Sequence, residues 1–199
     1  MSLSKRVNTV LGAIFAVLGL CLGLCVFCPK DALASSIAMP QTQSELMDYI
    51  SSKYEVGDAL SPEDANLVKQ ASVAAQNASR ESKGVNETRT AYGTTALMYG
   101  SVWHNGTFNY NFGGNLTGKI TAGSTPRSMT LTVRCQSYGL VGGSTVLTYD
   151  DSVSQTSSNS KSVSMSKSKN YSGVAAVYII NTSLDVTTAN GQGFTVNAQ

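Results

Sequence analysis

Nine residues near the middle of the chain alternate strictly between hydrophobic and polar side chains. Residues 128–136 read SMTLTVRCQ, in which every second residue from Met129 to Cys135 is apolar and the residues between them are polar. A period of two places the two sets on opposite faces of a β-strand. The segment therefore predicts a strand with one face in a core and the other in solvent.

Shorter segments between residues 88 and 199 show the same alternation. Examples are FNYNF (108–112), VSMS (163–166) and the second half of VAAVYIINTSLDV (174–186). Turn-forming pairs separate these segments, namely Asn105-Gly106, Gly113-Gly114, Gly142-Gly143 and Asn190-Gly191. Short strands at such spacing predict a mainly β fold, an antiparallel β-sandwich of immunoglobulin-like or jelly-roll-like type, with a barrel as the alternative.

Residues 35–87 carry a helical pattern instead. Leu46, Met47 and Ile50 share one face of a helix, and a second helix is expected from Ser61, a capping residue followed by proline and two acidic residues. Gly84 is expected to end it. The sequence thus predicts a helical hairpin, placed before a sandwich domain at residues 88–199.

The two predicted parts differ in charge. Residues 35–87 hold eight acidic and four basic residues, whereas residues 88–199 hold three acidic and seven basic residues. The two parts either attract each other or do not interact at all, or the acidic segment is a pro-region that precedes a basic module directed at an anionic surface. The basic residues are too sparse for a nucleic-acid interface.

Residues 1–34 have the features of a secretory signal peptide. Lys5 and Arg6 precede the uncharged apolar run 10–27, and the small-residue triplet Ala-Leu-Ala follows at 32–34. This order predicts export, with cleavage between Ala34 and Ser35 and an extracellular mature protein. The alternative is an uncleaved N-terminal membrane anchor, because the run is at the short end of lengths that span a bilayer. No other membrane contact is expected.

Three of the four cysteines lie in or beside this apolar run. Cys21, Cys25 and Cys28 have the spacing of iron–sulfur ligands, but an apolar helix directed to a membrane offers no site for a cluster. Cleavage would leave Cys135 as the sole cysteine, a buried thiol on the hydrophobic face of its strand. The mature fold must then hold without a disulfide, which favours a bacterial source. No metal or cofactor is expected.

Candidate catalytic residues are few. His104 is the only histidine, and the neighbouring Asn-Gly pair predicts a surface position at a hairpin tip. Ser101 lacks the glycine pattern of a nucleophile elbow. Asp150 and Asp151 are adjacent on a predicted strand, so they point to opposite faces and cannot act as a carboxylate pair. The sequence therefore predicts a protein without enzymatic activity.

Four aromatic residues are the candidates for binding. They are Tyr99, Trp103, Tyr110 and Phe112, interleaved with asparagine and glycine. Such rings stack on sugars while amides hydrogen-bond to them, and the alternative is that the rings form the sandwich core. A cell-wall polymer, another carbohydrate, or the surface of a host or competitor cell would be the partner.

Together these features predict a secreted, non-catalytic protein with a β-sandwich module for binding or adhesion, acting at a bacterial cell surface. A secreted antimicrobial or toxin-like effector with an acidic pro-region is the first alternative. A hydrolase of unknown class is the second.

Overall fold

The computed structural model describes residues 40–76, 82–106, 109–173 and 175–198. The predicted signal peptide, including its apolar run and the cleavage site at Ala34 and Ser35, lies outside the described residues. Within them, neither helix has the length and hydropathy needed to cross a membrane.

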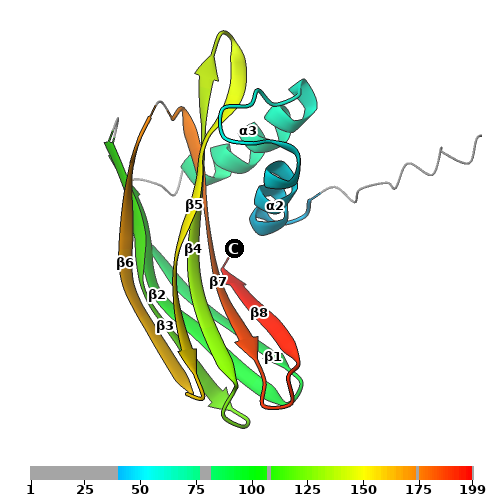
Figure 1. Cartoon of the computed structure of the whole chain (residues 1–199), viewed down its shortest axis with the longest axis vertical. Helices are drawn as coiled ribbons and strands as arrows, with labels where there is room; N and C mark the ends of the chain where they lie inside the picture. Colours follow the sequence, from blue (N-terminus) through cyan, green and yellow to red (C-terminus); the bar gives the residue numbers. More distant parts are fainter. Residues whose placement is uncertain (1–39, 77–81, 107–108, 174, 199) are drawn as a thin grey trace, which may run out of the picture. The chain divides into compact units, whose positions relative to one another are not determined.

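Within the described residues, two antiparallel four-stranded sheets form a sandwich, and two short helices precede them (Figure 1). The helices are α2 (Gln43–Lys53) and α3 (Pro62–Gln76). The strands are β1 (Lys83–Ala91), β2 (Thr94–Asn105), β3 (Asn109–Ala122), β4 (Ser128–Val141), β5 (Ser144–Ser158), β6 (Ser162–Ser172), β7 (Val177–Thr187) and β8 (Gly193–Ala198). The sheet orders are β1-β2-β3-β6 and β5-β4-β7-β8. The predicted β-sandwich with a preceding helical segment is confirmed.

The main core lies between the two sheets. Met129, Leu131, Val133 and Cys135 of β4 are all fully buried there, as their alternation predicts. They meet inward-facing residues of the other sheet, such as Phe112 and Leu116 of β3. Each fully buried aliphatic or aromatic side chain stabilises the fold by about 1.5–3 kcal/mol, so this core supplies the stability that a disulfide would otherwise provide.

Long basic side chains close the two edges of the sandwich. On one side Lys167 of β6 donates to the backbone carbonyl of Ser154 on β5 at 2.7 Å. On the other side Arg89 of β1 donates to the carbonyl of Thr195 on β8 at 2.6 Å. Cations at sheet edges also oppose edge-to-edge association with other chains.

Both helices begin with side-chain caps. Thr42 and Glu45 form a capping box at the start of α2, in which the Thr42 hydroxyl accepts from the Glu45 amide and the Glu45 carboxylate accepts from the Thr42 amide, each at 3.2 Å. Ser61 accepts from the Asp64 amide at 3.2 Å at the start of α3, as its sequence predicts. Lys53 then joins the helices through an ion pair with Asp64 at 2.7 Å.

The helices pack against the outer face of the β5-β4-β7-β8 sheet and form a second core with it. Apolar residues of α2 and α3, Met47 and Val68 among them, contact Tyr138, Leu147 and Ile179 of the sheet. An isolated antiparallel β-bridge joins Ala59, in the loop between the helices, to Val146 of β5. The helical segment is therefore built into the same compact unit as the sandwich, residues 40–199.

The strands begin earlier than the sequence pattern indicates. β1 starts at Lys83, so the expected boundary between residues 87 and 88 lies inside a strand. Gly84, expected to end the second helix, is also part of β1. The cause is that β1 is an edge strand with a single buried side chain, Val85, and so carries almost no hydrophobic alternation.

Candidate binding site on the outer face of one sheet

The outer face of the β1-β2-β3-β6 sheet consists mainly of hydroxyl and amide side chains. Alternation in β2 places Tyr99, Ser101 and Trp103 outside, because Met98 and Val102 are buried inside. Paired residues on neighbouring strands share a face. The outward-facing polar residues of β3 and β6 therefore include Asn109, Asn111, Asn115, Thr117, Ser162, Ser164, Ser166, Ser168, Asn170 and Ser172, and Lys119 is a charged residue among them.

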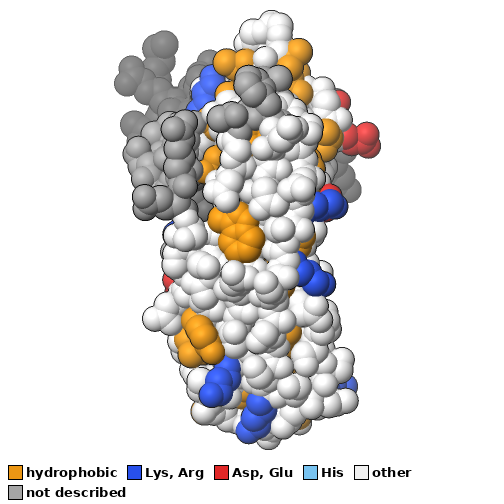
Figure 2. Space-filling view, turned by 90° about the vertical axis from the view of Figure 1, so that its left-hand side faces the viewer, with side chains coloured by type: hydrophobic (Ala, Val, Ile, Leu, Met, Phe, Trp, Pro, Cys, Tyr) orange, Lys and Arg blue, Asp and Glu red, His pale blue; other side chains and the backbone are white. Residues whose placement is uncertain are grey.

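Figure 2 shows the side of the protein on which β6 lies in Figure 1. Most of this surface is neutral and polar, with separate hydrophobic groups set into it. Lysine and arginine side chains lie toward the lower end and one margin. The centre of the face thus offers hydrogen bonds and apolar contacts with little net charge.

Trp103 is held on this face by a chain of hydrogen bonds across three strands. Its indole Nε1 donates to Oδ1 of Asn111 at 2.7 Å, and Nδ2 of Asn111 donates to Oδ1 of Asn170 at 2.6 Å. Trp103 itself is half-buried. The ring is therefore fixed in orientation while part of it remains accessible to a ligand.

Further cross-strand hydrogen bonds order the surrounding polar side chains. Ser166 donates to Asn115 at 2.7 Å, and Ser172 donates to Asn109 at 2.8 Å. Side chains that are ordered before binding lose less conformational entropy when a ligand arrives. The face is thus preorganised for hydrogen bonding along β3 and β6.

The four aromatic residues proposed as a binding group do not lie together. Tyr99 is 43% exposed on the outer face, on the same side as Trp103. Phe112 is fully buried and Tyr110 is 7% exposed, so both belong to the core between the sheets. On both β2 and β3 the even-numbered residues face inward, so Tyr110 and Phe112 lie inside whereas the odd-numbered Tyr99 and Trp103 lie outside. Tyr110 and Phe112 are therefore not available to a surface ligand.

The prediction that His104 lies at the surface is wrong, since it is 7% exposed. β2 continues to Asn105, and alternation then puts His104 on the inner side beside Val102. The imidazole stacks on Tyr178, with ring centroids 3.6 Å apart, and its Nε2 shares a hydrogen bond with the Tyr171 hydroxyl at 2.6 Å. Burial lowers the pKa of His104 to about 4, so the ring is neutral at physiological pH.

The described residues do not assemble a catalytic triad at His104. Ser101 lies on the opposite face of β2, so its hydroxyl cannot donate to the imidazole. The Tyr171 hydroxyl that contacts His104 also contacts Ser137, and the described hydrogen bonds of His104 include no carboxylate. In a catalytic triad the histidine must hydrogen-bond both to the nucleophile's hydroxyl and to a carboxylate.

Asp150 and Asp151 point in opposite directions, as their spacing predicts. Asp150 faces α2 and binds Arg134, whereas Asp151 of β5 pairs with Lys169 of β6 across the edge of the sandwich. Among the described residues, no group of three side chains is placed to hold a metal ion.

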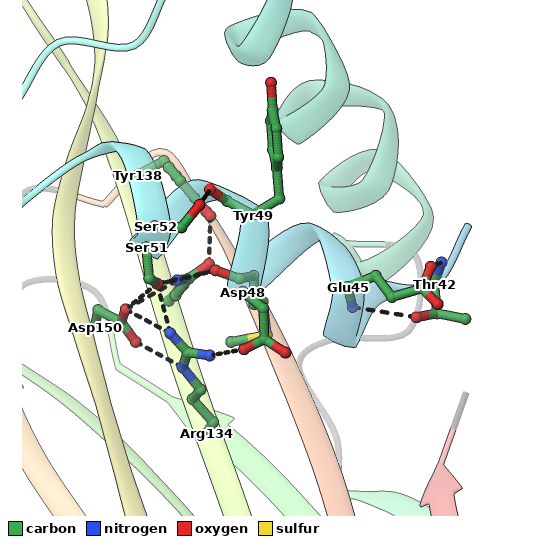
Figure 3. Close-up of polar contacts among 11 residues, drawn as sticks. Thr42, Glu45, Asp48, Tyr49, Ser51, Ser52, Arg134, Tyr138 and Asp150 are labelled. Carbon is green, nitrogen blue, oxygen red and sulfur yellow. Dashed lines mark hydrogen bonds and ion pairs between the residues drawn. The ribbon is translucent and has the colours of Figure 1, made fainter. Parts of the chain in front are cut away.

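A polar cluster fastens α2 to the sheet (Figure 3). Gln136 of β4 is fully buried and donates to the Met47 carbonyl at 3.0 Å and to Ser51 at 2.6 Å, and Tyr138 donates to Gln136 at 2.6 Å. Burial by itself raises the pKa of Asp150, but hydrogen bonds from Arg134, Ser51 and Gln136 outweigh it and lower that pKa. The polar groups of this cluster hydrogen-bond to one another, and we interpret the cluster as a structural contact that holds α2 on the sheet.

Cys135 is buried in the main core, as predicted. Burial raises the pKa of its thiol to about 12, so the thiolate needed for a nucleophile or a metal ligand does not form at ordinary pH. The residue acts as a small hydrophobic side chain.

No protein-family model matches the chain, and it has no match among the curated proteins. Function must therefore be inferred from the described residues.

Proposed function

We propose that the protein is a secreted, non-catalytic binding module whose outer β1-β2-β3-β6 face attaches to a neutral carbohydrate polymer at a cell surface. The observation that carries the proposal is Trp103, half-buried and oriented by Asn111 and Asn170 within a face of hydroxyls and amides. Tyr99 adds a second exposed ring on the same strand.

The chemistry of this face suits a sugar. A sugar ring has apolar C–H patches that stack on aromatic faces, and hydroxyls that both donate and accept hydrogen bonds. Serine, threonine and asparagine side chains also donate and accept, so they match hydroxyls in either role. Lys119 is the charged residue on the face, which favours a neutral polymer over an anionic one.

The spacing of the two rings supports a polymer over a single sugar. Tyr99 and Trp103 are four residues apart on β2, a distance of about 13 Å at roughly 3.3 Å per residue. One monosaccharide cannot contact both rings. A chain lying along β2 would place different sugar units on each ring.

The helical segment is better explained as a permanent part of the fold than as a removable pro-region. α2 and α3 share a core with Tyr138, Leu147 and Ile179, and the buried Gln136 donates to two acceptors on α2, the Met47 carbonyl and the Ser51 hydroxyl. Intact-mass analysis of culture supernatant tests both points. We expect a species starting at Ser35, whereas one starting near Val85 would favour the effector alternative.

Co-sedimentation with insoluble polymers tests the binding face. Purified cell-wall sacculi, chitin and cellulose would each be mixed with the wild-type protein, Trp103→Ala and Tyr99→Ala. We expect binding to at least one polymer, weakened by about tenfold or more in Trp103→Ala, as for an aromatic hot spot. Tyr92→Ala is the matched control, since Tyr92 is exposed at the β1–β2 turn, away from the centre of this face.

Two outcomes would contradict the proposal. The wild-type protein could fail to sediment with every polymer, or Trp103→Ala could bind as tightly as the Tyr92→Ala control. Trp103 is the only tryptophan in the chain, so its emission offers an independent titration with soluble oligosaccharides.

A further inference from the structure

Two adjacent aliphatic side chains are exposed at the end of one β-hairpin. Among the described residues, the most exposed large aliphatic side chains are Leu140 at 60%, Val141 at 58% and Val56 at 58%. Leu140 and Val141 are neighbours at the end of β4. Val56 lies in the loop between the helices, where the amide of the next residue donates to the Leu147 carbonyl of β5 at 2.8 Å. The adjacent pair Leu140 and Val141 differs from aliphatic residues exposed singly, which are common on protein surfaces.

Leu140 and Val141 form the tip of the β4–β5 hairpin, which extends beyond the helices at one end of the sandwich (Figure 1). Gly142 and Gly143 make the turn, with φ of 58° and 86°, a conformation that favours glycine. The strands stay paired up to Val141 and Ser144. Most backbone groups of the tip are therefore hydrogen-bonded and could leave water at small cost.

The hairpin carries no charge along its whole outer length. Residues 135–149 contain no Asp, Glu, Lys or Arg. The charged residues that flank this stretch, Arg134 and Asp150, are paired with each other at 2.7 Å. Moving the turn at residues 140–144 into an apolar medium therefore desolvates no charged side chain of the hairpin itself, while Glu55 and Asp58 lie on the loop beside Leu147 and would stay in water.

We propose that the β4–β5 hairpin tip inserts shallowly into a lipid bilayer, with Leu140 and Val141 at the boundary of the hydrocarbon region. Adjacent residues on a strand point to opposite faces, so these two side chains project on both sides of the hairpin. A groove on a protein partner would cover one face and leave the other in water. Hydrocarbon that surrounds the tip would cover both.

The attachment would be weak and reversible, because two side chains bury little apolar area. It does not depend on the carbohydrate face, which lies on the other sheet. Where both surfaces are engaged, the second attachment becomes intramolecular and the combined binding is tighter than either alone.

Flotation with phosphatidylcholine vesicles, with and without added phosphatidylglycerol, tests the proposal. The protein would start at Ser35, which keeps the compact unit of residues 40–199 and omits the apolar run that would itself bind lipid. We expect Leu140→Ser combined with Val141→Ser to lower the vesicle partition coefficient by about tenfold or more. Binding should depend little on anionic lipid or salt, since the tip holds no cation.

Tyr92→Ser is the matched control, because it removes an exposed ring from a different hairpin and should leave partitioning unchanged. Thermal unfolding should be the same for all variants, since the substituted side chains are exposed. In a second readout, Val141→Cys carries a polarity-sensitive fluorophore whose emission should shift to the blue when vesicles are added. Labelling is selective because Cys135 is buried.

Three results would overturn the proposal. The wild-type protein could remain unbound at high lipid concentration, or the double variant could float as well as the wild type. The third result is concentration-dependent self-association that the double substitution abolishes without any vesicle binding, which would make a second copy of the chain the partner of the tip.

Discussion

Arg134 donates two hydrogen bonds to Asp150 on the neighbouring strand, from Nε at 2.9 Å and from Nη2 at 2.7 Å. The same guanidinium donates to Asp48 of α2 at 2.7 Å. One side chain thus joins two strands to a helix more than 80 positions earlier in the sequence. Figure 3 shows all three groups converging beneath α2.

Arg134→Met should lower the free energy of unfolding by about 3 kcal/mol, because it leaves the Asp150 carboxylate largely buried without a cation. Urea unfolding monitored by circular dichroism measures the change. Lys169→Met is the control, since Lys169 and Asp151 form a more exposed ion pair that is worth about 1 kcal/mol or less. Equal losses in the two variants would mean that the Arg134 cluster does not hold the helix in place.

The buried His104 should make stability fall in mildly acidic solution. Its pKa is about 4 in the folded protein and about 6.5 when unfolded, so the unfolded chain takes up a proton first as the pH falls. This contribution is complete above pH 6.5 and is lost between pH 6.5 and 4, amounting to about 3 kcal/mol at most. Melting temperature against pH measures it.

His104→Phe is the test of that assignment. The variant keeps an aromatic ring beside Tyr178 but cannot be protonated, so its melting temperature should be flatter over the same range. The pKa values of Asp64, Asp150 and Asp151 are lowered in the folded protein. The stability that these carboxylates contribute is therefore lost only as the pH falls below their ordinary pKa of 3.8. An unchanged slope in His104→Phe would show that another group is responsible.

Gly113→Ala should destabilise the β3–β6 pair. A Cβ at this position would lie 2.3 Å from the backbone carbonyl oxygen of Lys167, which cannot move without breaking the strand pairing. We expect a loss of about 2 kcal/mol or more in urea unfolding. Gly84→Ala is the matched control on β1, where a Cβ meets nothing within 4 Å, and it should be neutral or slightly stabilising.

Cys135 should be unreactive toward thiol reagents in the folded protein. The protein that starts at Ser35 contains this cysteine alone, and burial raises the pKa of its thiol to about 12. Reaction with an aromatic disulfide reagent should therefore be very slow in buffer and give one equivalent in denaturant. Rapid reaction in buffer would mean that β4 opens readily.

The features that the sequence predicted well are local. Strict alternation from Met129 to Cys135 placed those side chains correctly, because a strand needs only its neighbours to define its two faces. The caps of the helices at Thr42 and Ser61 depend on residues within one turn, and Ser61 was identified for that reason.

The features that it missed depend on contacts between distant segments. Gln136 lies on the polar side of its strand, yet it is fully buried because α2 covers it, and no pattern within β4 indicates that cover. The position of His104 required knowing that β2 runs on to Asn105. The candidate face was only half identified, since Trp103 and Tyr99 lie on it while Tyr110 and Phe112 do not. Its asparagines at 111 and 170 meet only through the β3–β6 pairing.

The strand order also dictates when the protein can fold as it is synthesised. β1 and β2 can pair early. However, Phe112 of β3 cannot pair with Lys169 of β6, nor Leu131 of β4 with Leu184 of β7, until the later strand has been synthesised. Neither sheet can be completed before most of the chain has left the ribosome, and pairings between such distant positions form slowly. The complete sandwich therefore cannot form until synthesis is nearly finished, a property that would suit the proposed export.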